Sequence, residues 1–478
     1  MVVQHNMQAA NANRMLNVTT SAQSKSTEKL SSGYRINRAA DDAAGLTISE
    51  KMRKQIRGLD QASTNAQDGV SSVQTAEGAL TEVHSMLQRM NELATQAANG
   101  TNSKDSDRQA IQDEIDQLTT EIDRVSETTK FNETYLLKGE DGTKTINMKA
   151  HDAGLKGKLT DNGDGTATFV MDTLNAGDKV SIGGKSYTIG SDDAEVDKWF
   201  TDNGNDVKDA ATKKVTVNGT EYTYYAAKAA NTTAGSLTDG WNAGWYASAP
   251  TDKGDGTGTA LSGKFADVDA IKAEVKKGAT VQNGTKSVTG MNDTTPKDGV
   301  SDTDATVISK NKAYELASKE LLKANQIGDT EGKAKVGTSA NVDTAVDLTN
   351  GDGTFSIKVG QAKVANSLAF SLHVGADADM TNKIQVNIDA MDSASLGIKG
   401  LNVKDDSGNA ATYAVDAISD AISKVSSQRS SLGAVQNRLE HTINNLDNVV
   451  ENTTTAESRI RDTDMAEEMV NYSKNNIL

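Results

Sequence analysis

The stretch LDQASTNAQDGVSSVQTAEGALTEVHSMLQRMNELATQA, from Leu59 to Ala97, determines the architecture of this chain. Its apolar residues recur at steps of three or four, which is the pattern of an amphipathic helix and is close to a heptad seam. Ile48, Met52 and Ile56 continue the stripe toward the N-terminus. We therefore predict one helix from about residue 44 to residue 99, on the order of 80 Å long at 1.5 Å per residue. The stripe residues are Ala62, Ala66, Val70, Val73, Ala76, Leu80, Val83, Leu87, Met90, Ala94 and Ala97.

Two further stretches repeat this spacing. Ser106 and Gln109 have the spacing of a capping box, and a second stripe follows from Ile111 to Val125. A third stripe runs from Val415 to Ile460. Since none of these helices can bury its stripe alone, they are expected to pack as a bundle that brings the chain ends together.

The segment before residue 44 has a weaker apolar pattern. It is rich in Asn, Ser and Thr, which favour caps and turns over helix interiors. We predict that residues 1–43 are poorly ordered in the monomer unless neighbouring chains surround them.

The middle of the chain has a different composition. Residues 138–410 hold 33 of the 40 glycines, both prolines and all three tryptophans, whereas all twelve arginines lie outside this range. Alternating apolar residues around Gly183-Gly184 and Asn218-Gly219 predict two β-hairpins. The middle is therefore predicted to be a β-rich α+β insert of one or two modules. Helices are expected near 192–200 and 308–324, and a third hairpin, with residues 370–374 facing residues 384–388, is assigned to the bundle.

Composition and motifs exclude several functions. A net charge of −16 and a pI near 4.9 argue against nucleic-acid binding, and no stretch approaches the length of a membrane span. The chain has no cysteine, and no two of its five histidines have the spacing of a zinc-protease helix. Gly-Asp-Gly-Thr at Gly163, Gly254 and Gly351 is read as Asp-Gly turns, because the ligand spacing of a calcium loop is missing. We expect no enzyme activity, no catalytic residues, no metal and no cofactor.

The restriction of arginine to the two end segments suggests an interface role. Arginine forms bidentate pairs of fixed geometry that lysine does not form. We expect these segments to contact other subunits while the middle faces water.

Four stretches carry a specific family resemblance. They are LSSGYRINRAADDAAGLTISEKMRK from Leu30, LQRMNELATQAANGTNS from Leu87, EIDRVSETTKFN from Glu121 and LGAVQNRLEHTINNL from Leu432. Together they make the first 140 and last 110 residues, approximately, resemble bacterial flagellins.

The resemblance implies a secreted, extracellular protein that self-assembles into the flagellar filament used for swimming. It would be exported through the flagellar type III channel and would meet an export chaperone and the cap and junction proteins. It also implies a short apolar tail after Leu478, which this sequence lacks, so assembly by this chain stays an open expectation. The implied divisions are an inner segment (1–43), bundle (44–140), insert (141–365), bundle (366–455) and inner segment (456–478).

Flagellins of this kind are also ligands of Toll-like receptor 5, an innate immune receptor. Carried onto matching positions, the implied contacts are Gln88, Arg89, Glu92 and Leu93 in LQRMNEL and Glu114 in IQDEI. Arg89 is expected to be the anchor, because interface hot spots favour arginine.

Two alternatives stay open at this stage. One is the hook–filament junction protein, a flagellin relative with similar ends. The other is a filament protein whose insert is an adhesin or glycan-binding module, for which Trp241, Trp245 and Tyr246 are the candidate aromatic platform.

Overall fold

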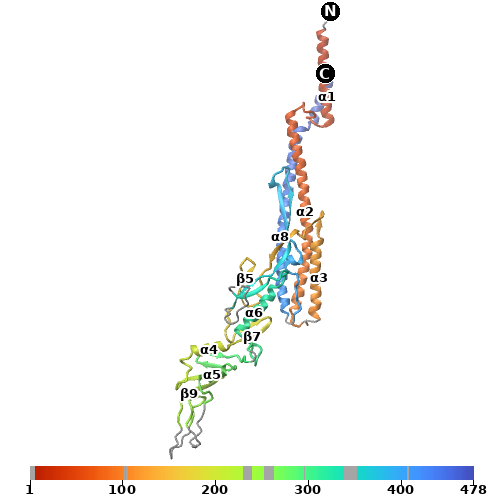
Figure 1. Cartoon of the computed structure of the whole chain (residues 1–478). Helices are drawn as coiled ribbons and strands as arrows, with labels where there is room; N and C mark the ends of the chain where they lie inside the picture. The colour runs from red at the N-terminus through yellow and green to blue at the C-terminus, as the bar shows by residue number, and fades with distance from the viewer. Residues whose placement is uncertain are drawn as a thin grey trace, which may run out of the picture.

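The computed structural model of the chain is elongated, with both termini at one end and a β-rich region at the other (Figure 1). It describes residues 6–101, 103, 106–229, 240–251, 263–294, 297–338, 353–405 and 408–477. The helices of the two chain ends run side by side, and the middle of the chain extends beyond them. The predicted fold class, a long helical bundle with a β-rich insert, is confirmed.

The bundle consists of α2 (Ala43–Ala97), α3 (Asp107–Thr128) and α8 (Asn409–Arg461), which confirms the three predicted helices. The carboxylate of Asp42 caps α2 by accepting a hydrogen bond from the Gly45 amide at 2.8 Å. The predicted capping box at Ser106 is wrong. Ser106 is the N-cap residue, but φ −116° and ψ −59° do not aim its hydroxyl at the first turn. The hydroxyl bonds Ser103 and Asp107 instead.

The predicted stripes form the core of the bundle, except at Ile48 in the N-terminal extension of the first stripe, which is 47% exposed. Most stripe residues of α2 are completely inaccessible to solvent, and they pack against the stripes of α3 and α8. The hairpin β17 (Leu368–His373) and β18 (Lys383–Ile388) covers α2 and α8, as predicted, with Phe370 opposite Val386. The core includes Val73, Leu80, Val83, Leu87, Met90, Leu93, Ile111, Ile115, Ile122, Val386, Ile388, Ile418, Val425 and Leu432.

The chain ends form a separate pair of helices, α1 (Met7–Ser32) and α9 (Met465–Ile477). Low order was expected here, but the structure forms a helix over most of the N-terminal segment. Thr19 and Thr27 donate to the carbonyl four residues back, the second from Oγ1 to Gln23 O at 2.9 Å. Of the residues in α1, only Ser26 is buried. The mobility of this segment in the monomer stays a prediction.

The insert contains two modules with separate cores, which answers the question of one module or two. The proximal module packs two sheets around α6 (Lys310–Asn325). One sheet has the order β13 (Val307–Ser309), β7 (Lys185–Gly190), β6 (Lys179–Ile182), and the other has the order β14 (Lys335–Thr338), β15 (Thr354–Lys358), β5 (Thr166–Met171), β4 (Gly157–Asp161).

The distal module packs one sheet against α4 (Asp193–Asp202) and α5 (Val268–Val275). The order of this sheet is β10 (Gly244–Tyr246), β9 (Thr220–Tyr225), β8 (Lys214–Val217), β11 (Thr280–Asn283), β12 (Lys286–Thr289). Because the chain leaves the proximal module after β7, forms the distal module and returns before β13, the distal module is inserted into the proximal one.

Both predicted hairpins within the insert are present. The Asn218-Gly219 turn has φ values of 47° and 78°, the left-handed region that such two-residue turns require. The first Gly-Asp-Gly-Thr copy is the predicted turn between β4 and β5. The copy at Gly254 lies outside the described residues, as does Gly351 of the third.

A two-stranded ribbon of β3 (Glu140–Asn147) and β16 (Gln361–Asn366) leads from the bundle into the proximal module. After α3, β1 (Lys130–Phe131) pairs with β2 (Thr134–Tyr135). Two short helices, the 3-10 helix Met380–Asn382 and α7 (Ser393–Leu396), lie between β17 and α8 in the sequence.

Candidate functional site

The candidate recognition surface lies on the exposed faces of α2 and α3. Arg89 projects from α2 and donates from Nε to Glu114 Oε1 of α3 at 2.8 Å. Its Nη1 donates to Glu92 Oε2, one helical turn along, at 3.2 Å. These bonds, that to Glu114 foremost, raise the pKa of Arg89 above its ordinary value. The cluster therefore presents one guanidinium held between two carboxylates, all three exposed.

One of the five predicted contact residues, Leu93, does not lie on this surface. Leu93 is only 2% exposed and lies in the bundle core. Its position explains this, because Leu93 follows Met90 by three residues on the buried stripe. Gln88 is exposed beside the cluster, with its amide nitrogen 3.1 Å from His84 Nε2. Four of the five predicted contacts are accessible, and Leu93 supports them from beneath.

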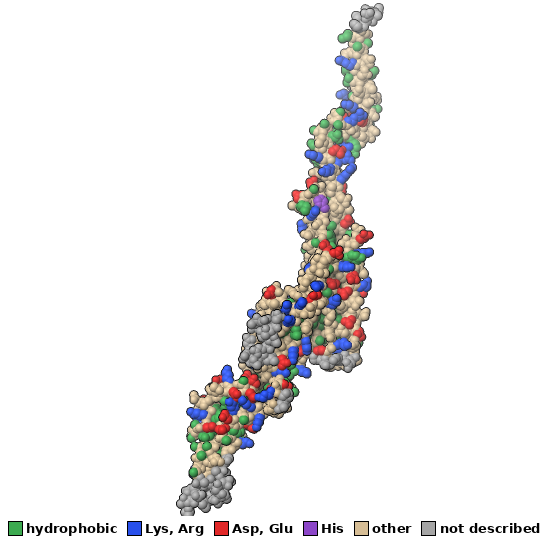
Figure 2. All heavy atoms as spheres, viewed as in Figure 1, with side chains coloured by type: hydrophobic (Ala, Val, Ile, Leu, Met, Phe, Trp, Pro, Cys, Tyr) green, Lys and Arg blue, Asp and Glu red, His purple; other side chains and the backbone are tan. Residues whose placement is uncertain are grey.

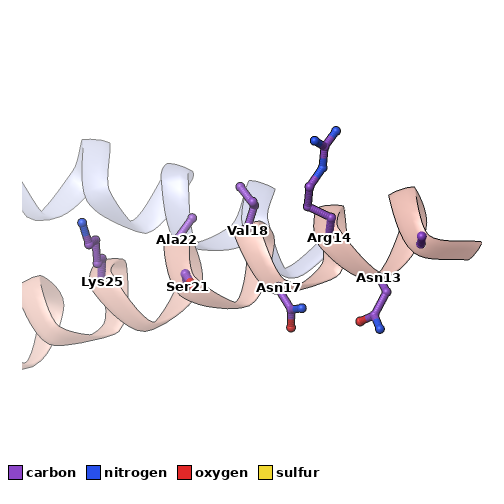
Figure 3. Close-up of a pocket in the computed structure, with 8 residues that line it drawn as sticks. Asn13, Arg14, Asn17, Val18, Ser21, Ala22 and Lys25 are labelled. Carbon is purple, nitrogen blue, oxygen red and sulfur yellow. The ribbon is translucent and has the colours of Figure 1, made fainter. Parts of the chain in front are cut away.

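A second candidate surface is the outside of the terminal helix pair. Apolar side chains are exposed on both α1 and α9, including Leu16 at 64% and Val470 at 68%. Figure 2 shows hydrophobic side chains on the visible face of this end of the molecule. Figure 3 shows a hollow along α1, with Arg14, Val18 and Lys25 projecting on one side. Exposed apolar side chains on two helices that pack together are typical of an interaction surface.

The arginines of the end segments do not all face outward. Arg108 is 2% exposed and donates to three backbone carbonyls, those of Ala97, Asn99 and Asp405. Arg461 pairs with Glu50 at 3.1 Å within the chain. The expectation that arginine here serves contacts with other subunits is therefore wrong for these two residues, which join segments of the same chain.

The aromatic platform expected for an adhesin is not formed. Trp245 is completely buried in the distal module, and its Nε1 donates to Asp209 Oδ1 at 2.9 Å. Tyr246 is also buried. Trp241 is partly exposed by itself, with Lys228 Nζ 4.8 Å from its ring centroid. Two of the three aromatic residues thus contribute to packing rather than to an open surface.

The described part of the chain holds no group of three or more His, Cys, Asp or Glu side chains placed to bind a metal ion. Within the same residues, none of the helices has the length and apolarity needed to cross a membrane.

The sequence matches known proteins at both ends and along its length. The family model described as the bacterial flagellin N-terminal helical region matches residues 3–141, and the flagellin C-terminal helical region matches residues 415–478. A flagellin of Clostridium tyrobutyricum is 36% identical over all of this chain and 96% of its own length. Flagellin C of Vibrio anguillarum is 33% identical over all of this chain and 93% of its own. A flagellin of Halalkalibacterium halodurans reaches 56% identity over 149 residues, which are 31% of this chain and 54% of that protein.

Proposed function

The chain belongs to the bacterial flagellin family, a family of structural proteins rather than enzymes, and from this premise we propose that it polymerises into the flagellar filament and serves swimming motility. The main observation behind this proposal is the exposure of apolar side chains on the terminal helix pair, α1 and α9. Burial against copies of the same pair would remove these side chains from water. We assign residues 1–43 and 456–478 to the inner layer, 44–140 and 366–455 to the bundle layer, and 141–365 to the outside.

The same premise supports proposals on export and partners. We propose that the chain is secreted through the flagellar type III channel, with an export chaperone, and that it meets the cap and junction proteins at the growing filament. Two of the relatives quoted above, from Clostridium tyrobutyricum and Vibrio anguillarum, are flagellins that match the whole of this chain, which favours the filament subunit over the hook–filament junction protein.

Seeded growth tests the assembly proposal. Purified chain is added to short flagellar filament fragments, and filament length is followed by negative-stain electron microscopy. The parent should extend the seeds, whereas Val470→Asp should not, because it places a charge on the apolar surface of α9. Asn471→Asp adds the same charge at a polar, exposed position next to it and should still assemble. Equal growth of parent and Val470→Asp would contradict the role of this surface.

We further propose that Gln88, Arg89, Glu92 and Glu114 form the surface recognised by Toll-like receptor 5. The carboxylates of Glu92 and Glu114 hold the guanidinium of Arg89 in one position, so less side-chain entropy is lost when a partner binds. Leu93 contributes by packing rather than by contact.

Receptor signalling in cultured cells tests this proposal. Arg89→Ala should lower the signalling potency of the purified monomer and leave the helical circular dichroism spectrum unchanged. Arg53→Ala is the matched control, because Arg53 also pairs with a glutamate three residues away, Glu50, at 3.2 Å. If Arg89→Ala signals as strongly as the parent, the assignment of Arg89 as anchor is wrong.

A further inference from the structure

The junction between the bundle and the insert is built around the first turns of α8. Tyr413 belongs to α8, yet its side chain is part of the hydrophobic core of the proximal module. Its hydroxyl donates to Glu320 Oε2 of α6 at 2.7 Å. Burial, and secondly Glu320, raises the pKa of Tyr413, so the hydroxyl keeps its proton and stays a donor. A bundle helix thus supplies a core residue to the insert.

The start of α8 is fixed from the bundle side as well. The carboxylate of Asp405 accepts hydrogen bonds from the backbone amides of Gly408 and Asn409, at 2.7 and 2.9 Å. The carbonyl of the same Asp405 accepts from Arg108 Nη1 at 2.7 Å. Arg108 in turn holds the C-terminal carbonyls of α2, so α2, α3 and α8 are tied together at this end of the bundle.

Further contacts surround Tyr413. The turn of the β6–β7 hairpin sits against Asn409, so closely that a Cβ on Gly184 would lie 2.7 Å from the Asn409 side chain. The loop after α6 touches the end of α7, where a Cβ on Gly328 would lie 2.5 Å from the carbonyl oxygen of Gly397. Lys149, in the chain leading into the module, pairs with Asp420 of α8 at 2.8 Å.

The junction between the two modules has a different construction. The chain crosses it twice, and Ser191 and Gly290 form a single parallel bridge there. Ser191 and Met291 share a backbone hydrogen bond at 2.9 Å. Lys297 and Asp193 pair at 2.7 Å, with exposed side chains that solvent screens. Met291 is buried at this crossing, but the hydrophobic core clusters of the two modules share no residue.

We infer that Tyr413 clamps the proximal module to the bundle as one rigid body, and that the distal module reorients relative to both. The clamp resists bending because moving the module away would expose the Tyr413 ring and break its buried hydrogen bond. The distal crossing has no comparable ring in the residues described. Domain reorientation is the default where an interface within a chain is small and polar.

Spin-label distance measurements test this inference, and the absence of cysteine allows labels at chosen sites only. One label is placed at Ser419→Cys on α8 and the second at Lys158→Cys in the proximal module or at Ser287→Cys in the distal module, all three positions being exposed. The distance distribution from Ser419 to Lys158 should be narrow, and that from Ser419 to Ser287 at least about twice as broad. Equal widths in the parent chain would overturn the inference.

Substitutions of Tyr413 test whether this residue holds the proximal module to the bundle, apart from any effect on folding. Tyr413→Ala should broaden the distribution from Ser419 to Lys158, and Tyr413→Phe, which keeps the ring and removes only the hydroxyl, should broaden it less. Tyr222→Phe alters a partly buried tyrosine that packs against the core of the distal module, to which Tyr413 does not belong, and should leave the distribution unchanged. If Tyr413→Ala lowers the helical signal, the comparison rests on Tyr413→Phe. A distribution as narrow in the Tyr413 variants as in the parent would overturn the clamp.

Discussion

The bundle and the terminal helix pair are both helical, but their apolar side chains are buried to different extents in the single chain. Leu80 of α2 and Leu16 of α1 are both helical leucines, yet Leu80 is completely buried and Leu16 is 64% exposed. In the bundle, α3, α8 and the β17–β18 hairpin cover α2. In the terminal pair, α1 packs against α9, and most of the described residues of both helices stay exposed. Helix formation and burial are therefore separate requirements, and other chains would be needed to bury the apolar surface of the terminal pair.

Hydrogen exchange should show the largest difference between the two regions. Amides in the middle of α2 exchange only through opening of the bundle, whereas amides of α1 can exchange through local fraying. We expect exchange in the monomer to be at least about a thousandfold slower in α2, which corresponds to about 4 kcal/mol of opening free energy. Mass spectrometry of proteolytic fragments measures both regions in one sample. Slow exchange across α1 in dilute solution would contradict the predicted mobility of residues 1–43.

Matched leucine truncations should give the next largest effect. Leu80→Ala leaves a cavity in the bundle and should lower the free energy of unfolding by about 3 kcal/mol. Leu16→Ala removes the same atoms from an exposed site and should change it by less than about 0.5 kcal/mol. Urea unfolding followed by circular dichroism at 222 nm, a wavelength dominated by helix, measures both. Equal losses would mean that the terminal pair is already packed in the monomer.

Removal of the buried guanidinium at the end of the bundle should have a somewhat smaller effect. Arg108→Met fills similar volume but leaves the carbonyls of Ala97, Asn99 and Asp405 without their donor. Buried carbonyls that lose their donors should cost about 2 to 3 kcal/mol in total, part of which water entering the site offsets. Arg38→Met is the control, because the Arg38 side chain is 72% exposed near the terminal pair and should leave the unfolding midpoint unchanged. An unchanged midpoint for Arg108→Met would show that water replaces the guanidinium at this site.

The comparison also explains what the sequence could predict. The stripes of α2, α3 and α8 predicted their helices to within a few residues, since periodic burial is encoded locally. The sequence does not predict the helix α1, because Asn, Ser and Thr favour caps and turns, yet the structure satisfies Thr19 and Thr27 with carbonyls four residues back. At the candidate site, Arg89 and its carboxylates could be placed from the sequence. The burial of Leu93 could also be predicted from the sequence, because Leu93 follows Met90 by three residues on the buried stripe.

Other features could not be predicted because they depend on contacts between distant segments. Arg108 and Asp405 are 297 positions apart, and no local pattern announces their contact. Tyr413 lies at the beginning of a bundle helix, and only the packing of α6 shows that its ring serves the insert. The nesting of one module within another likewise follows from strand pairing, in which β7 pairs with β13 across the whole distal module.

The smallest expected effect is a pH dependence of the stability of the bundle. It arises in the β17–β18 hairpin, which covers the bundle but not the terminal pair. Asp389, just after β18, accepts a hydrogen bond from Ser367, just before β17. This bond, and secondly Lys144, lowers the pKa of Asp389 below its ordinary value of 3.8. A lowered pKa in the folded state means that the stabilisation is fully present above the ordinary value and is lost as the pH falls through the lowered one.

Ser367→Ala removes the main cause of that lowered pKa. The variant should therefore be less stable than the parent at pH 6, and the difference should shrink steadily below about pH 4 as Asp389 takes up a proton. Because Asp389 is about half exposed, solvent screens the effect and keeps it smaller than that of Arg108→Met. Urea midpoints measured from pH 6 to pH 3 test it, with Ser371→Ala, at an exposed position of the same strand, as the variant whose profile should stay parallel to the parent. If the difference in urea midpoint between Ser367→Ala and the parent stays constant with pH, the Ser367 hydroxyl stabilises the hairpin through packing. The charge of Asp389 would then make no contribution to the stability of the hairpin that covers the bundle.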